Sequence, residues 1–194
     1  MSAPPSPGRL PLLLGITILA MFGLITLGAL VRATDSGLGC PDWPLCQGRI
    51  IPVFDYHVII EYSHRTTASV VGMLVIASAA MVWWKHRDSK ALKTLMTFAV
   101  IALIVQVILG GITVKMELPG EVVTAHLFAA EVLFATLIIS ILILLKPLPA
   151  RGTPRDPLFY WVVGMAAATM IILLTGTYIV GRDASAVCPD WPMC

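Results

Sequence analysis

The stretch LGALVRATDSGLGCPDWPLC at residues 27–46 decides how the chain is organised, because a related stretch, TGTYIVGRDASAVCPDWPMC, occupies residues 175–194. The two are offset by 148 positions, and eight of their twenty aligned residues are identical. Self-similarity at a fixed offset indicates a duplicated unit. We therefore expect a first unit at residues 1–148 and a truncated second unit at residues 149–194, because the counterpart of His64 would lie beyond the last residue.

Long apolar segments surround these stretches. The sequence is 58% hydrophobic and 12% charged, whereas soluble domains contain about 25% charged residues. Five segments have roughly the 20 residues that a helix needs to cross a bilayer; they cover about residues 10–31, 58–84, 94–114, 122–145 and 158–180. The sequence therefore predicts an all-α integral membrane protein, with a four-helix transmembrane bundle and a fifth transmembrane helix that begins a second repeat. The first segment lacks a small-residue cleavage site, so we interpret it as a retained helix.

The positive charges predict the orientation. Eight of the thirteen Lys and Arg residues fall on the side of the N-terminus and four on the other side, and the richer side is normally cytoplasmic. The loops at 32–57, 115–121 and 181–194 would then face outward, and they hold all four cysteines, as an oxidising compartment permits. The net charge of +2 is too small and too scattered to indicate a nucleic-acid surface.

Ionisable side chains inside the predicted helices are costly in hydrocarbon, so they are candidates for function. In the motif EYSHR, the i, i+3 and i+4 spacings place Glu61, His64 and Arg65 on one helix face. His126, in the fourth predicted helix, lies at a depth like that of His64, roughly 8 to 10 Å below the outer surface at 1.5 Å per residue. Two imidazoles at matched depth suit the two axial positions of a haem iron. The planar guanidinium of Arg65, with its paired N–H donors, would suit a haem propionate.

The alternative for these side chains is a structural or solvent-exposed role. A lone buried histidine is more often hydrogen-bonded to a neighbouring helix, but two at equal depth favour a ligand pair. Zinc normally needs at least three protein ligands. Glu131 is expected to have a structural role within the bundle, and His57 and His86 are expected to be solvated.

The motif CPDWPLC separates Cys40 and Cys46 by five residues. One interpretation is a structural disulfide that closes a proline-stiffened loop, and the other is a redox pair. We favour a structural or slow redox role, because catalytic dithiols usually have C-x-x-C spacing. Cys188 and Cys194 could form an equivalent disulfide in the second unit. Trp43 is expected at the membrane interface, and the pair Gly110 and Gly111 at a close helix contact.

Together these residues resemble the haem A synthase family. Its hallmarks are a cysteine pair in the outer loop after the first span, an E-x-x-H-R motif opening the second span and a histidine opening the fourth. They correspond here to Cys40 and Cys46, to residues 61–65, and to His126 in VVTAHLFAAE. The resemblance covers the whole chain, and the combination of motifs is specific. In that family two four-helix halves are related by duplication, which the offset of 148 indicates independently.

The resemblance implies oxidation of the C8 methyl group of haem O to a formyl group, which gives the haem A of cytochrome oxidase. By motif, His64 and His126 would bind the substrate haem iron, Glu61 would serve the chemistry, and Cys40 and Cys46 would form the loop disulfide. A haem b is implied for the second half, whose histidine pair this chain lacks. Also implied are a bacterial plasma membrane location and contacts with lipid, haem O synthase and cytochrome oxidase assembly. A homo-oligomer is a further expectation.

Bis-histidine ligation constrains the chemistry, because oxygen could bind the iron only if one imidazole left. We therefore hypothesise stepwise electron removal, two additions of water at the C8 carbon and collapse of a gem-diol, with Glu61 accepting protons or stabilising charge. Two other functions fit part of the sequence. A membrane b-type cytochrome would use the histidines alone, and a quinone-coupled thiol oxidoreductase would use the cysteine pair alone.

Overall fold

The computed structural model describes residues 8–146 and 157–181. Its elements are five helices, each long and apolar enough to cross a membrane: α1 Arg9–Ala33, α2 Tyr56–Lys85, α3 Lys90–Lys115, α4 Gly120–Leu145 and α5 Pro157–Gly181. The described residues form no strand beyond an isolated bridge between Cys46 and Arg49. The predicted all-α membrane class is therefore confirmed.

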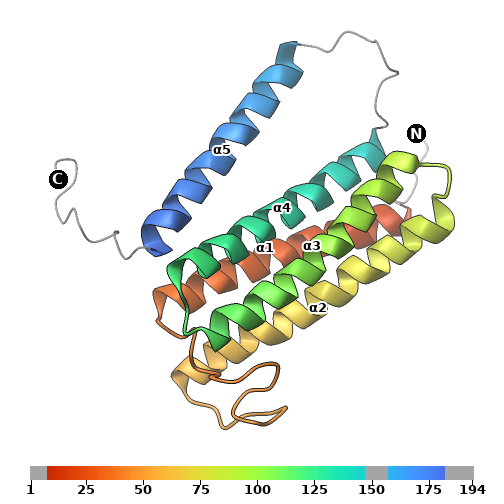
Figure 1. The fold of residues 1–194 in the computed structure, drawn as a ribbon. Helices are drawn as coiled ribbons and strands as arrows, with labels where there is room; N and C mark the ends of the chain where they lie inside the picture. Colours follow the sequence, from red (N-terminus) through yellow and green to blue (C-terminus); the bar gives the residue numbers. More distant parts are fainter. Residues whose placement is uncertain (1–7, 147–156, 182–194) are drawn as a thin grey trace, which may run out of the picture.

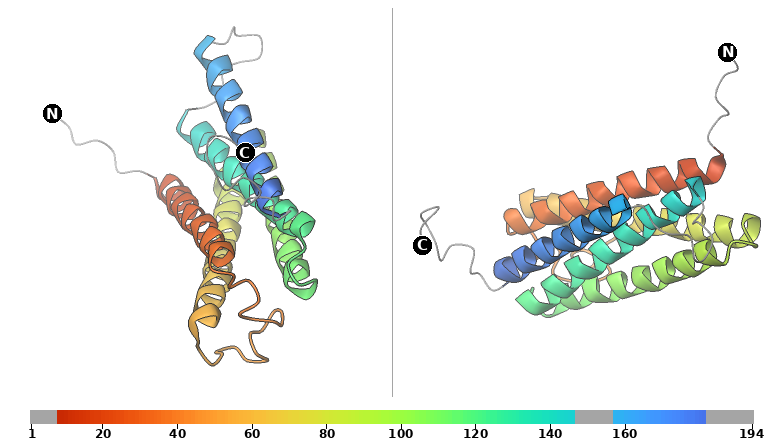
Figure 2. Two further views of the ribbon diagram at one scale, coloured as in Figure 1. Left: turned by 90° about the vertical axis from the view of Figure 1, so that its left-hand side faces the viewer. Right: turned by 90° about the horizontal axis from the view of Figure 1, so that it is seen from above.

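Helices α1 to α4 form an antiparallel bundle in which each helix packs against two neighbours (Figure 1). In the described residues α2 and α4 share no direct contact, so they occupy opposite corners of the bundle. Helix α5 lies alongside α4, outside this bundle, and makes no other helix contact in the described part (Figure 2). Most of its described side chains are exposed. A four-helix bundle with a fifth helix beside it is the arrangement that the predicted fold class describes.

The helices extend beyond the apolar segments because polar residues cap them. The Asp55 carboxylate accepts a hydrogen bond from the Val58 backbone N–H at 2.9 Å and begins α2. The Ser89 hydroxyl accepts one from the Leu92 N–H at 3.4 Å and begins α3. Such caps satisfy N–H groups that have no partner within the helix.

The main hydrophobic core lies mostly in one half of the bundle. Its main cluster takes one fully buried side chain or more from each of the four helices, including Leu14, Val75, Met96 and Leu137. These four lie in the half remote from the loop that joins α1 to α2, and the cluster reaches Ala130 of α4, one turn after His126. The half next to that loop contains His64 and His126, so the two histidines lie on the loop side of most of this apolar packing.

The loop between α1 and α2, residues 34–55, lies at one end of the bundle beside the α3–α4 turn (Figure 1). A disulfide joins Cys40 to Cys46, which are 0% and 2% exposed. The Asp42 carboxylate then accepts two backbone hydrogen bonds of 2.6 Å, from the N–H groups of Gln47 and Gly48. Both of these residues have positive φ angles, 55° and 67°, which suit a tight turn. The loop is thus closed by covalent and polar contacts within itself.

The loop also docks on the bundle. A Cβ at Gly111 of α3 would lie 3.1 to 3.3 Å from three ring atoms of Trp43, so the indole lies directly on this glycine. A Cβ at Gly37 would lie 2.9 Å from the side chain of Leu118, in the α3–α4 turn. These close contacts fix the loop over the end of the bundle.

Candidate functional site

His64 and His126 are partly buried in the loop-proximal half of the bundle. The His64 ring lies against α1, where a Cβ at Gly28 would be 3.1 Å from its Cε1 atom. The His126 ring lies against α3, where a Cβ at Gly110 would be 3.4 Å from its Cε1 atom. The structure thus brings both rings into the same half of the bundle, each on a glycine of a neighbouring helix.

Both imidazoles have an unsatisfied ring nitrogen. The Nδ1 atoms of His64 and His126 are buried and have no hydrogen-bond partner among the described residues. Buried polar atoms are normally hydrogen-bonded. A purely structural histidine would be expected to have a hydrogen bond at this nitrogen, and neither ring has one in the described residues. Among residues 8–146 and 157–181, no group of three or more His, Cys, Asp or Glu side chains could hold a metal ion. A conventional zinc site is therefore unsupported, whereas two imidazoles can bind a haem iron.

Glu61 lies one turn before His64 on α2 and is 5% exposed. Its Oε1 atom accepts a hydrogen bond of 2.7 Å from Nε of Arg65. The described residues provide no hydrogen bond to its Oε2 atom. The carboxylate is therefore held at one oxygen and available at the other.

Arg65 connects α2 to the loop between α1 and α2. Its guanidinium reaches the loop, where Nη1 and Nη2 donate to three backbone carbonyls, those of Asp42, Leu45 and Cys40. With the bond to Glu61, four of its five N–H groups are engaged. Any contact with a propionate would have to use the remaining N–H.

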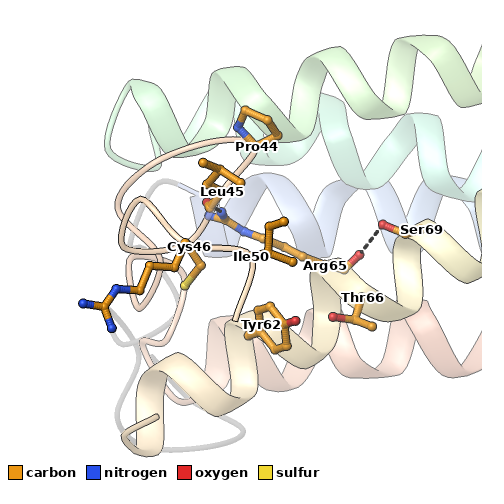
Figure 3. A pocket seen from close by; sticks show the side chains of 9 residues that line it. Pro44, Leu45, Cys46, Ile50, Tyr62, Arg65, Thr66 and Ser69 are labelled. Atoms are coloured by element: carbon orange, nitrogen blue, oxygen red, sulfur yellow. Dashed lines mark hydrogen bonds between the residues drawn. The ribbon is translucent and has the colours of Figure 1, made fainter. Parts of the chain in front are cut away.

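An open pocket of about 200 Å³ lies beside Arg65, between the loop and α2. Figure 3 shows Arg65 extending from the helix toward Leu45, with Tyr62 and Thr66 on the same helix below the loop. The pocket is lined by residues of the loop and of α2. Four hydrogen bonds fix the guanidinium at its edge.

Several residues that shape the site are not evident as site residues in the sequence. Gln106 of α3 is 8% exposed, and its Nε2 donates to the His126 carbonyl at 2.9 Å. Gly110 and Gly111 do more than bring two helices together, since they accommodate the His126 and Trp43 rings. Gly28 could have been found from the internal repeat, because the offset of 148 aligns it with an identical glycine. Gln106 has no comparable signal in the sequence.

The remaining candidates lie outside this arrangement. Glu131 is five residues after His126 on α4, and its Oε2 atom is buried without a partner among the described residues; its structural role stays a prediction. His57 is exposed and lies 3.0 Å from the Ser36 hydroxyl, measured from Nδ1. Trp43 is 37% exposed and packs on Gly111. Cys188 and Cys194 lie outside the described residues.

Comparison with known proteins adds the family. The model of the COX15-CtaA family, described as cytochrome oxidase assembly protein, matches residues 11–58 and 53–194. A heme A synthase of Bacillus licheniformis is 32% identical over 187 residues, which cover 92% of this chain and 61% of the relative. A heme A synthase of an Exiguobacterium species is 31% identical over 182 residues, 93% of this chain and 60% of the relative.

A third relative agrees with these two. The heme A synthase of Bacillus pumilus is 32% identical over 193 residues, which cover 95% of this chain and 63% of the relative. The chain thus spans about three fifths of the length of the relatives it matches. With five helices able to cross a membrane, it is a multi-pass membrane protein. The resemblance inferred from the cysteine pair, the E-x-x-H-R motif and the second histidine is confirmed: the chain belongs to the COX15-CtaA family, the family of the heme A synthases.

Proposed function

We propose that this chain carries the substrate half of a haem A synthase, in which His64 and His126 bind the iron of haem O. The observation that carries the proposal is the pair of partly buried imidazoles whose Nδ1 atoms have no partner in the described residues. A neutral imidazole has one nitrogen that can only accept, and a metal bond satisfies such a nitrogen. Most of the main apolar cluster, including its fully buried side chains, lies in the other half of the bundle, which favours the loop-proximal half as the place for a porphyrin.

The proposed reaction converts the C8 methyl group of haem O into a formyl group. The conversion consumes one water molecule net and releases four electrons and four protons. Imidazoles on both faces of the iron leave no axial position for oxygen, so water supplies the new oxygen atom. Two successive two-electron oxidations, each followed by addition of water at the carbon, give a gem-diol that loses water to form the aldehyde. The electrons pass to an acceptor in the membrane.

Glu61 is the proposed catalytic residue. Its Oε1 is held by Arg65 at 2.7 Å, and its Oε2 has no described partner. A fixed carboxylate with one free oxygen can accept the protons that leave the carbon and the attacking water, and can stabilise developing positive charge.

The resemblance carries further proposals. We infer a cytoplasmic N-terminus, so that the disulfide loop faces outward, and location in the bacterial plasma membrane. A haem b site and a disulfide between Cys188 and Cys194 would belong to the second unit. Haem O synthase and the cytochrome oxidase assembly machinery are the proposed partners. They would either bind this protein or act directly before and after it, by supplying haem O and using haem A.

The porphyrin extracted from the purified chain tests the function. The chain is produced in cells that make haem O, and its bound pigment is analysed by mass spectrometry. We expect haem O together with a formyl product in the parent chain, and haem O alone in Glu61→Ala. Glu131→Ala, the same change at another membrane carboxylate, should leave the product unchanged. Equal formyl-haem from Glu61→Ala, or a parent chain with no bound haem, would contradict the proposal.

A further inference from the structure

The side chain of Arg65 joins two parts of the site that are far apart in the sequence. Its Nε donates to Glu61, one turn earlier on α2, at 2.7 Å. Its terminal nitrogens donate to carbonyl oxygens of the loop 20 to 25 residues earlier. The three acceptors are the carbonyls of Cys40, Asp42 and Leu45, at 2.6, 2.6 and 2.9 Å. One planar group thus contacts both the carboxylate and the loop.

All three carbonyls lie within the ring that the Cys40–Cys46 disulfide closes. They can converge on one cation only while this segment keeps its closed shape. The guanidinium is rigid and planar, so the position of its terminal nitrogens determines the position of its Nε and hence of the oxygen that Nε holds. Both partners in the ion pair are shielded, with side chains 16% and 6% exposed, and shielding strengthens charge-assisted hydrogen bonds.

We propose that Arg65 is a positioning residue that transmits the closed shape of the disulfide loop to the carboxylate of Glu61. The inference rests on the proposed role of Glu61, and it gives Arg65 a task other than binding a propionate. Arg65 holds Oε1, and Oε2 has no hydrogen-bond partner in the described residues and is the oxygen we assign to the reaction. Four of the five N–H groups of Arg65 are engaged in these hydrogen bonds, so the guanidinium follows the loop carbonyls when they move.

Coupling between two sites is reciprocal, which gives a test that does not depend on turnover. If Arg65 links Glu61 to the loop, removing the Glu61 carboxylate must loosen the loop, although the structure records no direct bond between them. The readout is the rate at which a water-soluble phosphine reduces the Cys40–Cys46 disulfide in the purified chain. Thiol labelling and peptide mass mapping separate this disulfide from the other two cysteines.

We expect reduction to be about threefold faster or more in Glu61→Ala, and intermediate in Glu61→Gln, whose amide oxygen can still accept from Nε. Arg65→Lys keeps the positive charge but cannot reach four acceptors at once, so it should also accelerate reduction. The double variant Glu61→Ala with Arg65→Lys should be no faster than Arg65→Lys alone. Non-additivity of this kind identifies residues that act through one another.

Two controls separate this coupling from general loosening. Arg49→Lys changes a cation of the same loop whose side chain has no described partner, and should leave the rate unchanged. Val75→Ala destabilises the core at a residue that is 0% exposed, remote from the loop, and should also leave it unchanged. A Glu61→Ala rate equal to that of the parent chain, or additive effects in the double variant, overturns the proposal.

Haem binding distinguishes positioning from propionate recognition. Arg65→Lys should bind haem O within about twofold of the parent affinity while formyl-haem production falls about tenfold or more. A loss of haem affinity that accounts for the loss of product would make Arg65 a substrate ligand and overturn the inference. If the parent chain makes no formyl-haem, the proposed function fails, and the reduction rates still decide whether Arg65 couples the loop to Glu61.

Discussion

The ring of His64 lies on Gly28: a methyl group at position 28 would be 3.1 Å from Cε1 and 3.6 Å from Nδ1 of the imidazole. The contact crosses from α2 to α1, and the glycine leaves the space that the ring occupies. A second glycine of α1, Gly23, has nothing within 4 Å of the position where its Cβ would be. One helix therefore offers a substitution and its matched control.

Gly28→Ala should weaken haem binding without unfolding the bundle. The added methyl group must displace the His64 ring, and overpacking of this kind costs about 1 to 3 kcal/mol, so we expect roughly tenfold weaker haem affinity. Gly23→Ala should keep the parent affinity and unfold at a slightly higher temperature, because alanine favours a helix over glycine by up to about 1 kcal/mol. Haem titration and thermal unfolding in detergent measure both effects. Equal affinities of the two variants would show that the contact with Gly28 does not position His64.

The adjacent glycines of α3 should respond differently to the same change. Gly111→Ala would bring a methyl group 3.1 to 3.3 Å from the Trp43 ring, which must shift, whereas Gly110→Ala would make only a 3.4 Å contact with His126. We therefore expect Gly111→Ala to loosen the loop and accelerate reduction of its disulfide. Gly110→Ala should leave that rate unchanged. A rate for Gly111→Ala like that of the parent would indicate that Trp43 does not anchor the loop.

Asp42 predicts a pH dependence of the loop. The backbone N–H of Gly48, then that of Gln47, holds the pKa of the Asp42 carboxyl below its usual range, with a smaller contribution from Arg65. Since this pKa is depressed in the folded loop, the carboxylate stabilises the turn above the unfolded value of about 4, and this stabilisation is lost as the pH falls through the folded pKa. Disulfide reduction, normalised to a small peptide disulfide, should accelerate as the pH falls below about 4.

Asp42→Asn provides the control for this prediction. An amide does not titrate, so the variant should lack the acceleration at low pH and should be reduced faster than the parent at neutral pH. Parallel pH profiles of parent and variant would mean that another group controls the loop.

How much the sequence could predict differs between the fold and the site. Five apolar segments were enough to predict five helices, and the structure lengthens them because Asp55 and Ser89 cap α2 and α3 outside the apolar runs. The spacing of Glu61 and Arg65 predicted one helix face, and the two side chains bond at 2.7 Å. This contact was predictable because side chains four residues apart are adjacent on any α-helix.

The contacts between distant segments could not be predicted in the same way. The guanidinium chemistry of Arg65 suggested a carboxylate partner, and nothing local indicated that three loop carbonyls would surround it. The sequence predicts that His64 and His126 lie at a similar depth, because depth follows from position along each helix. It does not predict that α2 and α4 occupy opposite corners of the bundle, which depends on how the four helices pack. Gly28 was detectable only as a glycine repeated at the offset of 148.

The central claim is that His64 and His126 together bind one haem iron, and the optical and electron paramagnetic resonance spectra of the purified chain loaded with haem O test it most directly. We expect the low-spin spectrum of iron with two imidazole ligands. His64→Ala and His126→Ala should each lose this spectrum, while His57→Ala and His86→Ala should keep it. Retention of the two-imidazole spectrum after substitution of either His64 or His126 would contradict the account.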